Sequence, residues 1–351
     1  MANYTIKEIS DRNIWEDFMT KQSPSVFMQS WNWGNFHRSL GRKVWNLGIF
    51  KDNELTGGCL CHVLPTKMRT HIYTSNGPVI NWEEYADIMP LLLDYLSNLG
   101  RKNNALFVRM DPLVLDEPEN NKIFQSLGMI KSSTHSQAQH KWILDITPDE
   151  EDLLSGMKKN TRYAIRRSAK EGIKVESSID PSDFDKFWDL FMETVERQSF
   201  VPHEKDYYIK QMKAFAEDRQ YRIYWSHLNG KVLATALIPF YGDTANYLHA
   251  ASTNEIKNTF PAHALIWQII RDAKAEGLSY FDFWGIAPTD DPKHPWSGFT
   301  FFKKSFGGFR QDVIKGYDLP LSAKYRIVRG LEKTRGLWAR KYFNIKKKLA
   351  R

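Results

Sequence analysis

Apolar residues follow two different periods along this chain, and the segments of each period alternate. Residues 44–50 and 55–64 alternate apolar and polar positions on either side of Lys51-Asp52-Asn53, which predicts a β-hairpin. Residues 82–100 have apolar side chains at helical spacing and end at Gly100, a residue favoured at helix C-termini. A second hairpin is predicted around Asn229-Gly230, a strong turn signal.

The remaining predicted elements continue this alternation, which is typical of an α/β (α+β) fold. A strand leading into a helix capped by Asp11 is predicted over residues 6–18. The other predicted strands are 105–112, 139–145, 173–176, 221–228, 232–241, 245–251 and 280–284, and the other helices are 120–127, 150–172, 181–196, 204–217 and 262–277.

The length of the chain, 351 residues with 42% hydrophobic content, predicts two domains of ordinary size. We place the first domain at residues 1–147 and the second at 148–320. Residues 321–351 form a basic tail, and its spaced apolar side chains predict an amphipathic helix pair. Such a tail suits an anionic membrane or RNA. Packing on the second domain with a solvated basic face is the favoured alternative.

The formal net charge of +8 favours an anionic partner, although a basic enzyme without any polyanion is the alternative. The two cysteines, Cys59 and Cys61, are two residues apart on a predicted strand and therefore share one face, so they are expected to stay as free thiols in a reducing compartment. No metal site follows from this pair. The N-terminus lacks an apolar signal core, and no apolar run is long enough for a bilayer, so we expect a soluble, cytoplasmic protein.

The most unusual stretch runs over residues 280–308. An aromatic strand at 280–284 is followed by a proline-containing loop and then by 299–306, where Lys303 and Lys304 lie among phenylalanines before Gly307-Gly308. A lysine flanked by rings is partly desolvated, so its charge acts strongly on a docked anion. The alternative is a short amphipathic helix whose lysines point to water and whose phenylalanines point to the core.

Two motifs resemble the Fem family of aminoacyltransferases, which build peptidoglycan cross-bridges with aminoacyl-tRNA as donor. The first is Asp282-Phe283-Trp284-Gly285-Ile286 with Gly298 and residues 302–308, and the second is the basic segment 156–172. The resemblance implies two tandem GNAT-like domains, without the coiled-coil arm of larger members. It implies a monomeric enzyme without cofactor or metal, which takes an amino acid from aminoacyl-tRNA. The acceptor is the stem-peptide amine of a peptidoglycan precursor, either UDP-MurNAc-pentapeptide or lipid II.

The resemblance also assigns the catalytic residues. It places Phe302 and Lys303 at the reaction centre, with Lys303 as a donor to the oxyanion or to phosphate. It places Asp111, at the end of a predicted strand before Pro112, against the ammonium or the amine of the acceptor. A plain turn-forming Asp-Pro is an equally good interpretation of Asp111.

Substrate-binding residues come from several segments. Residues 26–33 resemble the family's early Gln-Ser-Trp segment, and residues 193–208 resemble its segment that leads from a helix to the acceptor cleft. His203 and Tyr207 share a helical face if Pro202 opens the helix, and Tyr247 and His249 share a strand face. A core position is an equally good interpretation of the latter pair. The full predicted substrate-binding set is Trp33, Arg38, His203, Tyr207, Tyr247, His249 and Lys304.

The basic segment lacks acidic residues from 156 to 169, which favours contact with tRNA phosphates over a merely solvated helix. The predicted tRNA-binding residues are Lys158, Lys159, Arg162, Arg166 and Arg167.

Two other functions compete with this hypothesis. An acyl-CoA-dependent N-acyltransferase of the same fold needs a glycine-rich loop for the diphosphate, and residues 254–261 before the predicted helix 262–277 contain no glycine. A non-catalytic RNA- or membrane-binding protein would use the basic tail, and the aromatic–lysine stretch would then be structural.

Overall fold

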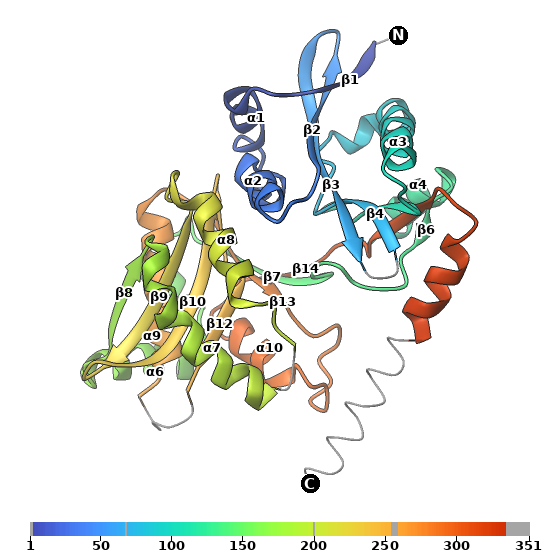
Figure 1. Ribbon diagram of the computed structural model, residues 1–351. Helices are drawn as coiled ribbons and strands as arrows, with labels where there is room; N and C mark the ends of the chain where they lie inside the picture. Colours follow the sequence, from blue (N-terminus) through green and yellow to red (C-terminus); the bar gives the residue numbers. More distant parts are fainter. Residues whose placement is uncertain (1–2, 67–68, 199–200, 254–258, 335–351) are drawn as a thin grey trace. The chain divides into compact units, whose positions relative to one another are not determined.

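The computed structural model describes residues 3–66, 69–198, 201–253 and 259–334 of the chain (Figure 1). It divides into two compact units, each made from separate parts of the sequence. The first unit comprises residues 1–18, 41–139 and 312–351, and the second comprises residues 19–40 and 140–311. Within the described residues, no helix combines the length and the apolar character that crossing a membrane requires.

The first unit contains, in its described part, a seven-stranded sheet in the order β1-β2-β3-β4-β5-β15-β6. Neighbouring strands are antiparallel except β4 and β5, which are parallel and are connected through helix α3 (Tyr85–Lys102). The strands are β1 (Tyr4–Glu8), β2 (Val44–Lys51), β3 (Glu54–Thr66), β4 (Arg69–Thr74), β5 (Phe107–Met110), β15 (Tyr317–Pro320) and β6 (Ile130–Lys131). The unit also contains helices α1 (Arg12–Met19) and α4 (Pro118–Ser126).

The predicted hairpin at residues 44–64 is confirmed as β2 and β3. Asp52 and Asn53 have φ of +50° and +70°, the left-handed conformation that a tight hairpin turn requires. The predicted start of the first helix is also correct, because the Asp11 side chain accepts a hydrogen bond from the Asn13 N–H at 2.8 Å.

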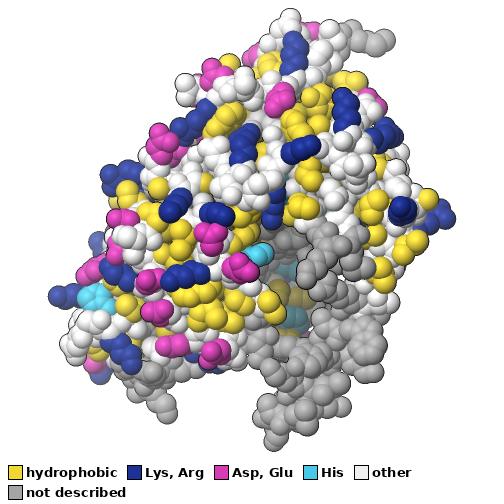
Figure 2. All heavy atoms as spheres, viewed as in Figure 1, with side chains coloured by type: hydrophobic (Ala, Val, Ile, Leu, Met, Phe, Trp, Pro, Cys, Tyr) yellow, Lys and Arg dark blue, Asp and Glu magenta, His cyan; other side chains and the backbone are white. Residues whose placement is uncertain are grey.

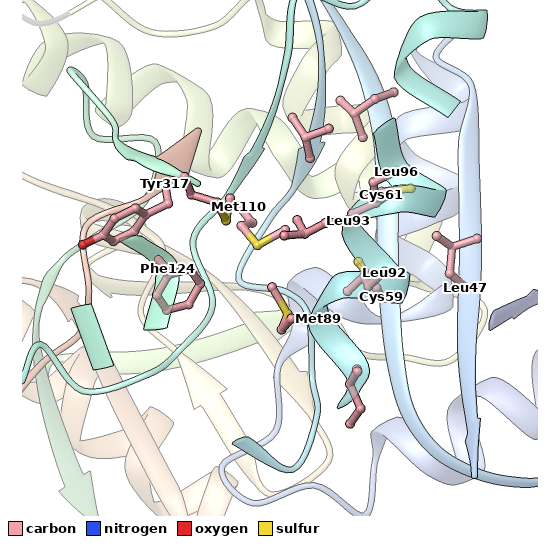
Figure 3. Packing of buried hydrophobic residues seen from close by; sticks show 14 of the residues in the cluster. Leu47, Cys59, Cys61, Met89, Leu92, Leu93, Leu96, Met110, Phe124 and Tyr317 are labelled. Atoms are coloured by element: carbon pink, nitrogen blue, oxygen red, sulfur yellow. The ribbon is translucent and has the colours of Figure 1, made fainter. Parts of the chain in front are cut away.

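The core of the first unit lies between α3 and one face of the sheet (Figure 3). Cys59 and Cys61 both belong to this core, as their spacing predicted, and both are buried free thiols. Side chains from α3 interdigitate with alternate residues of the strands, so the strand and helix periods identified from sequence meet here. The labelled members of the cluster are Leu47, Cys59, Cys61, Met89, Leu92, Leu93, Leu96, Met110, Phe124 and Tyr317.

The opposite face of β5 is covered by residues 325–334, which are helical. Tyr325 packs on Phe107, and the Tyr325 hydroxyl donates to Asp318 at 2.8 Å. Arg109 is buried and donates to both carboxylate oxygens of Asp318 at 2.6 and 2.8 Å. The expectation that this segment packs on the second domain is therefore wrong, because a buried ion pair and aromatic contacts attach it to the first unit. The rest of the predicted tail, residues 335–351, lies outside the described residues.

The second unit is built on an eight-stranded sheet in its described part, in the order β14-β7-β13-β11-β10-β9-β8, with β12 also paired to β10. Its parallel pair is β11 and β13, connected through helix α9 (Pro261–Ala275). The strands are β7 (His140–Asp145), β8 (Lys174–Ser178), β9 (Tyr221–Leu228), β10 (Lys231–Tyr241), β11 (Thr244–Asn246), β12 (His249–Ser252), β13 (Tyr280–Gly285) and β14 (Phe309–Asp312). Helix α7 (Asp185–Gln198) covers one face and α9 the other (Figure 1).

The two sheets repeat one strand order. In each, a meander of three strands is followed by a helix and by a parallel strand, and an antiparallel strand from elsewhere in the chain comes next. Strand β7 has that place beside β13, and β15 has it beside β5. For this reason the units do not follow the boundaries expected at 147 and 320: residues 140–145 complete the second sheet, and residues 317–320 complete the first.

Two predicted elements are each divided in two. The helix expected over residues 150–172 is α5 (Glu150–Gly156) and α6 (Lys159–Lys170), because Met157 and Lys158 adopt extended backbone conformations. The strand expected over 245–251 is also wrong as a single element. Strand β11 pairs with both β10 and β13, whereas β12 pairs with β10 alone, so the chain changes partner between them.

Candidate functional site

The most unusual side chain in the second unit is Lys303, in helix α10 (Ser297–Lys304). Lys303 is only 8% exposed, whereas Phe301 on the same helix is 61% exposed. The Lys303 Nζ donates to the carbonyl of Gly285 at 2.7 Å and lies 4.8 Å from the ring centroid of Phe299. An amphipathic helix with this lysine in water is therefore excluded, and the predicted desolvation of Lys303 is confirmed.

Burial changes the chemistry of this amine. Desolvation lowers the pKa of Lys303 from 10.5 to about 7, and the negative charge of Asp282 opposes that change. Near neutral pH the amine is therefore present in both protonation states. In its charged form it is a weakly hydrated cation, so its attraction for an anion is greater than that of a surface lysine.

The carbonyl under Lys303 belongs to a bulge at the end of β13. Asp282 lies opposite Ile143 and Gly285 lies opposite Lys141, so two residues of β13 face one residue of β7. Within the bulge Trp284 has φ of +64°, a left-handed conformation that is rare for a large side chain.

Lys141 forms a buried ion pair with Asp282, and its Nζ lies 4.7 Å from the ring centroid of Trp284. Sequence reasoning did not single out Lys141. The signal in the sequence was a lysine and an aspartate, each within a predicted apolar strand; that these strands pair is a property of the tertiary structure.

The glycine pair after α10 lets this helix approach β7 closely. Gly308 has φ of +91°, and a Cβ there would lie 2.2 Å from the carbonyl oxygen of Ile143. The carbonyl of Gly307 accepts a hydrogen bond from the Trp142 indole at 2.6 Å. Gly308 is thus required by its contact with β7, and Gly307 by its left-handed backbone, with φ of +87°.

Three other predicted residues lie around Lys303. The Tyr247 ring centroid is 5.9 Å from the Lys303 Nζ, and Tyr247 packs on the aromatic side chains of β13. Phe302 is partly buried against the core and contacts His263 at 5.0 Å between ring centroids. Lys304 pairs with Asp290 at 2.7 Å and remains partly exposed. The structure therefore brings Lys303 and Tyr247 together, and directs Phe302 into the core.

A second group of predicted residues gathers around α2 (Trp31–Ser39) and α8 (Lys205–Ala216). Trp33 is buried, and its indole nitrogen has no hydrogen-bond partner among the described residues. Tyr207 contacts Phe36 at 4.9 Å between ring centroids, which joins α8 to α2. Arg38 is exposed at the end of α2 and lies over the Trp31 ring.

His203 belongs to the same group, although Pro202 does not open the helix. Helix α8 begins at Lys205, and His203 nevertheless stacks on Tyr207 with centroids 3.9 Å apart. His249 contacts Tyr208 at 5.1 Å, and burial together with the charge of His203 lowers the pKa of His249 to about 4. Tyr247 and His249 therefore do not share a strand face: one lies near Lys303 and the other near Tyr208.

Some cations of the basic helix make contacts within the unit, and others are exposed. Arg162 donates to the carbonyl of Ser155 at 3.1 Å and to that of Met157, so it caps the end of α5. Arg167 pairs with Glu171 one turn later. Lys159 and Arg166 are exposed on α6, and the Lys158 Nζ lies 4.1 Å from the ring centroid of Phe301. On the face drawn in Figure 2, Lys and Arg are interspersed with Asp and Glu rather than gathered together.

Asp111 lies in the first unit, at the end of β5, and is 5% exposed. Its carboxylate accepts hydrogen bonds from the Tyr73 hydroxyl at 2.7 Å and from the Asn76 N–H at 2.8 Å. Burial raises the pKa of Asp111 to about 7, against the lowering effect of these hydrogen bonds. Asp111 lines a small recess together with His135 and Gln137.

No metal-binding group of three or more His, Cys, Asp or Glu side chains occurs in the described parts of the two units. The reactive features of the second unit are instead one desolvated amine, the aromatic rings around it and the exposed cations of α6. Such a set suits the binding of an anion and the stabilisation of developing negative charge.

Comparison with known proteins places these features in a wider group. A model of the FemAB family matches residues 11–231 and 224–333. Lipid II:glycine glycyltransferase of Staphylococcus aureus (strain MRSA252) is 21% identical over 384 residues, which cover 87% of this chain and 91% of that protein. The crystal structure of FemX aligns with a TM-score of 0.82 at 18% identity, over 93% of this chain and 100% of that chain. A tandem GNAT protein from the clavulanic acid biosynthesis pathway aligns with a TM-score of 0.55 at 11% identity, over 92% and 99%. These structural matches confirm the predicted tandem GNAT-like fold.

Proposed function

The chain belongs to the FemAB family, and from this premise we propose that it transfers an amino acid from aminoacyl-tRNA to the stem-peptide amine of a peptidoglycan precursor. Membership of the family makes it an enzyme of the transferase class. We propose, in addition, that the donor is aminoacyl-tRNA and that the acceptor is a peptidoglycan precursor, in lipid-linked or soluble form. A relative named for lipid II supports a lipid-linked acceptor, and UDP-MurNAc-pentapeptide is the soluble candidate.

The observation that carries the proposal is the buried amine of Lys303 beside the Gly285 carbonyl. An aminoacyl ester is already activated, so the enzyme needs to orient the amine and to stabilise the oxyanion. A desolvated ammonium is effective in that task because little water competes for it.

The proposed reaction has one bond formed and one broken. The acceptor amine attacks the ester carbon, and a C–N bond forms while the negative charge moves to the carbonyl oxygen. The Lys303 ammonium donates to that oxygen. The tetrahedral intermediate then collapses, the ester C–O bond breaks, and the proton lost by the amine is taken up by the leaving ribose oxygen, which becomes a hydroxyl. Charge and protons balance without a covalent enzyme intermediate.

The other predicted residues take supporting tasks under this proposal. Lys159 and Arg166 bind donor phosphates from the exposed face of α6. Lys158, Arg162 and Arg167 are fixed by contacts within the unit, and they position that face. Tyr247 and Lys304 line the space near Lys303. Asp111 binds the ammonium of the acceptor.

The start of α9 disfavours the acyl-CoA alternative. Pro261 is the first residue of this helix and has no N–H. The amides of His263 and Ala264 both donate to the carbonyl of Phe260, at 3.1 and 3.3 Å. Few N–H groups therefore remain at this helix start for a diphosphate.

The test is transfer from radiolabelled mixed aminoacyl-tRNA to each acceptor by the wild type and by Lys303→Ala. We expect a loss of about a hundredfold or more in rate for the variant, the cost of removing one oxyanion donor. Lys174→Ala, which alters an exposed lysine of the same unit, is the matched control and should retain wild-type activity. Near wild-type turnover by Lys303→Ala, or no transfer to either acceptor by the wild type, would refute the proposal.

A further inference from the structure

The Gly285 carbonyl is aimed at Lys303 by an irregular piece of backbone. Two residues, Phe283 and Trp284, occupy the space opposite one residue of β7, and Trp284 is left-handed with φ of +64°. A bulge with such a residue is costly and persists only where neighbouring groups hold it. The contacts of Asp282, Trp284 and Gly285 must therefore stabilise the bulge.

The two carboxylate oxygens of Asp282 have different partners. One oxygen accepts a hydrogen bond from the Trp284 N–H at 2.7 Å, which closes a turn over the bulge. The other oxygen pairs with the ammonium of Lys141. Lys141 in turn lies 4.7 Å from the centroid of the Trp284 ring, so both the backbone and the side chain of Trp284 are held.

A second hydrogen bond ties the same segment to α10. The Ala287 N–H donates to the buried hydroxyl of Thr300 at 2.9 Å, one helical turn before Lys303 donates to Gly285. The bulge and α10 are therefore joined at two points. Any change in the bulge displaces the carbonyl to which Lys303 donates.

We propose that Lys141 and Asp282 are positioning residues for Lys303: their buried ion pair holds the bulge at the end of β13 and sets the charge around the Lys303 amine. The assignment rests on the proposed function only in that Lys303 is taken as the reacting group. Neither residue needs to touch a substrate. The pair is nearly inaccessible to water, at 5% and 3% side-chain exposure, so its charges are weakly screened.

The charged and titratable groups around the lysine come from several elements. Asp282 of β13 acts on Lys303 through its charge, and Lys141 of β7 pairs with Asp282. The Tyr247 ring, just after β11, lies 5.9 Å from the Lys303 Nζ, and Lys304 of α10 is paired with Asp290. His263 of α9 reaches the neighbouring Phe302. Of these, Asp282 is the group whose charge favours the protonated form of Lys303.

Two single substitutions should move the apparent pKa of Lys303 in opposite directions. Asp282→Asn keeps an oxygen for the Trp284 N–H but removes the negative charge and leaves Lys141 unpaired, so the apparent pKa of Lys303 should fall. Lys141→Met removes the positive charge and leaves Asp282 unpaired, so the apparent pKa should rise. The double variant carries neither charge and buries no unpaired ion. Its apparent Lys303 pKa should lie between those of the two single variants.

The measurement is the pH titration of the Lys303 Nζ by NMR on the full chain with isotope-labelled lysine, and Lys303→Arg assigns the signal. We expect the titration midpoint to move by about one pH unit in opposite directions for the two single variants, since one unit corresponds to a modest change in a buried charge contact. In transfer assays kcat should fall about tenfold or more in Asp282→Asn while KM changes little, which is typical of lost positioning.

The outcomes separate this assignment from the proposed function. Opposite movements of the midpoint support it, even if Lys303→Ala proves to be active and the transfer mechanism is wrong. An unchanged Lys303 titration in both single variants overturns it, whatever happens to activity. If either single variant fails to fold, the double variant carries the test through kcat, because its Lys303 midpoint is expected between those of the single variants. A kcat equal to wild type would then overturn the assignment.

Discussion

The main-chain N–H of Lys158 donates to the carbonyl of Ser305 at 3.0 Å. This hydrogen bond joins the break between α5 and α6 to the end of α10, and so connects the two motifs that stand out in the sequence. The Lys158 Nζ reinforces the connection by lying over the ring of Phe301. The basic helix is therefore held against the helix that carries Lys303, which explains why both motifs occur in one unit.

The first prediction concerns the stability cost of the buried amine. Because the folded protein lowers the pKa of Lys303 from 10.5 to about 7, the unfolded chain binds more protons between these values, and stability rises with pH there. Lys303→Met removes this dependence. The variant should be more stable than wild type below about pH 7, by about 1.4 kcal/mol for each pH unit that separates the folded and unfolded pKa values, and the difference should shrink toward pH 10.5.

Urea unfolding of both proteins at a series of pH values measures this effect, with Lys174→Met as the exposed control. A variant that is both inactive and more stable would identify Lys303 as a residue kept for function. Equal stability at every pH would show that the amine is hydrated in the folded protein.

The second prediction concerns the glycine pair. Gly308→Ala should destabilise the second unit by about 2 kcal/mol or more, because its Cβ would lie 2.2 Å from the Ile143 carbonyl and its φ is +91°. Gly298→Ala in α10 is the matched control. A Cβ there meets nothing within 4 Å, so the variant should gain about 0.5–1 kcal/mol of helix stability. Thermal or urea unfolding distinguishes the two, and equal effects would refute the steric argument.

The third prediction separates the cations of α6. Charge reversal of Lys159 and Arg166 together should lower the affinity for aminoacyl-tRNA and reduce its salt slope by about two units, one for each phosphate contact. Arg162→Gln should instead lower the free energy of unfolding, since Arg162 caps α5 through the carbonyl of Ser155. Filter binding over a salt series gives the slope. Unchanged tRNA affinity in the double reversal would make this face of α6 a solvated surface.

The fourth prediction concerns Asp111. Asp111→Asn should lower the transfer rate and the acceptor affinity while donor affinity stays at the wild-type value, because an amide lacks the charge that holds an ammonium. Calorimetry and transfer assays on one preparation measure this. If acceptor affinity and rate both stay at wild type, Asp111 is a turn residue only.

The burial of Asp111 should also affect how stability depends on pH. Burial raises its pKa from 3.8 to about 7, so the folded protein binds more protons than the unfolded chain in that range, and this group lowers stability as pH rises. Asp111→Asn should lose that part of the pH dependence. Identical pH–stability curves for the two proteins would contradict the burial of the charge.

Much of the secondary structure follows from local pattern. The hairpin at Asp52-Asn53 and the turn at Asn229-Gly230 occur where the period and the turn residues predict them. The helix expected to end at Gly100 continues to Lys102 with Asn103 as its C-cap, and Gly100 lies inside it, where a Cβ would come 2.4 Å from the Leu321 side chain. Local backbone preference and one-sided burial determine such elements, and both can be identified within a short window. The family motifs likewise indicated Lys303, whose surrounding rings predicted its desolvation.

Pairing over long distances was decided by the tertiary structure. Nothing within residues 140–145 or 317–320 tells which sheet each strand completes, because a strand's pattern specifies which face it buries but not its neighbour. The same holds for Met157 and Lys158, whose extended backbone depends on the hydrogen bond to Ser305. The ion pair of Lys141 with Asp282 depends on two strands far apart in sequence becoming neighbours. The sequence by itself determined the periods, the turns and the type of chemistry. The packing decided which buried charges meet, since burial and pairing exist only once distant segments are in contact.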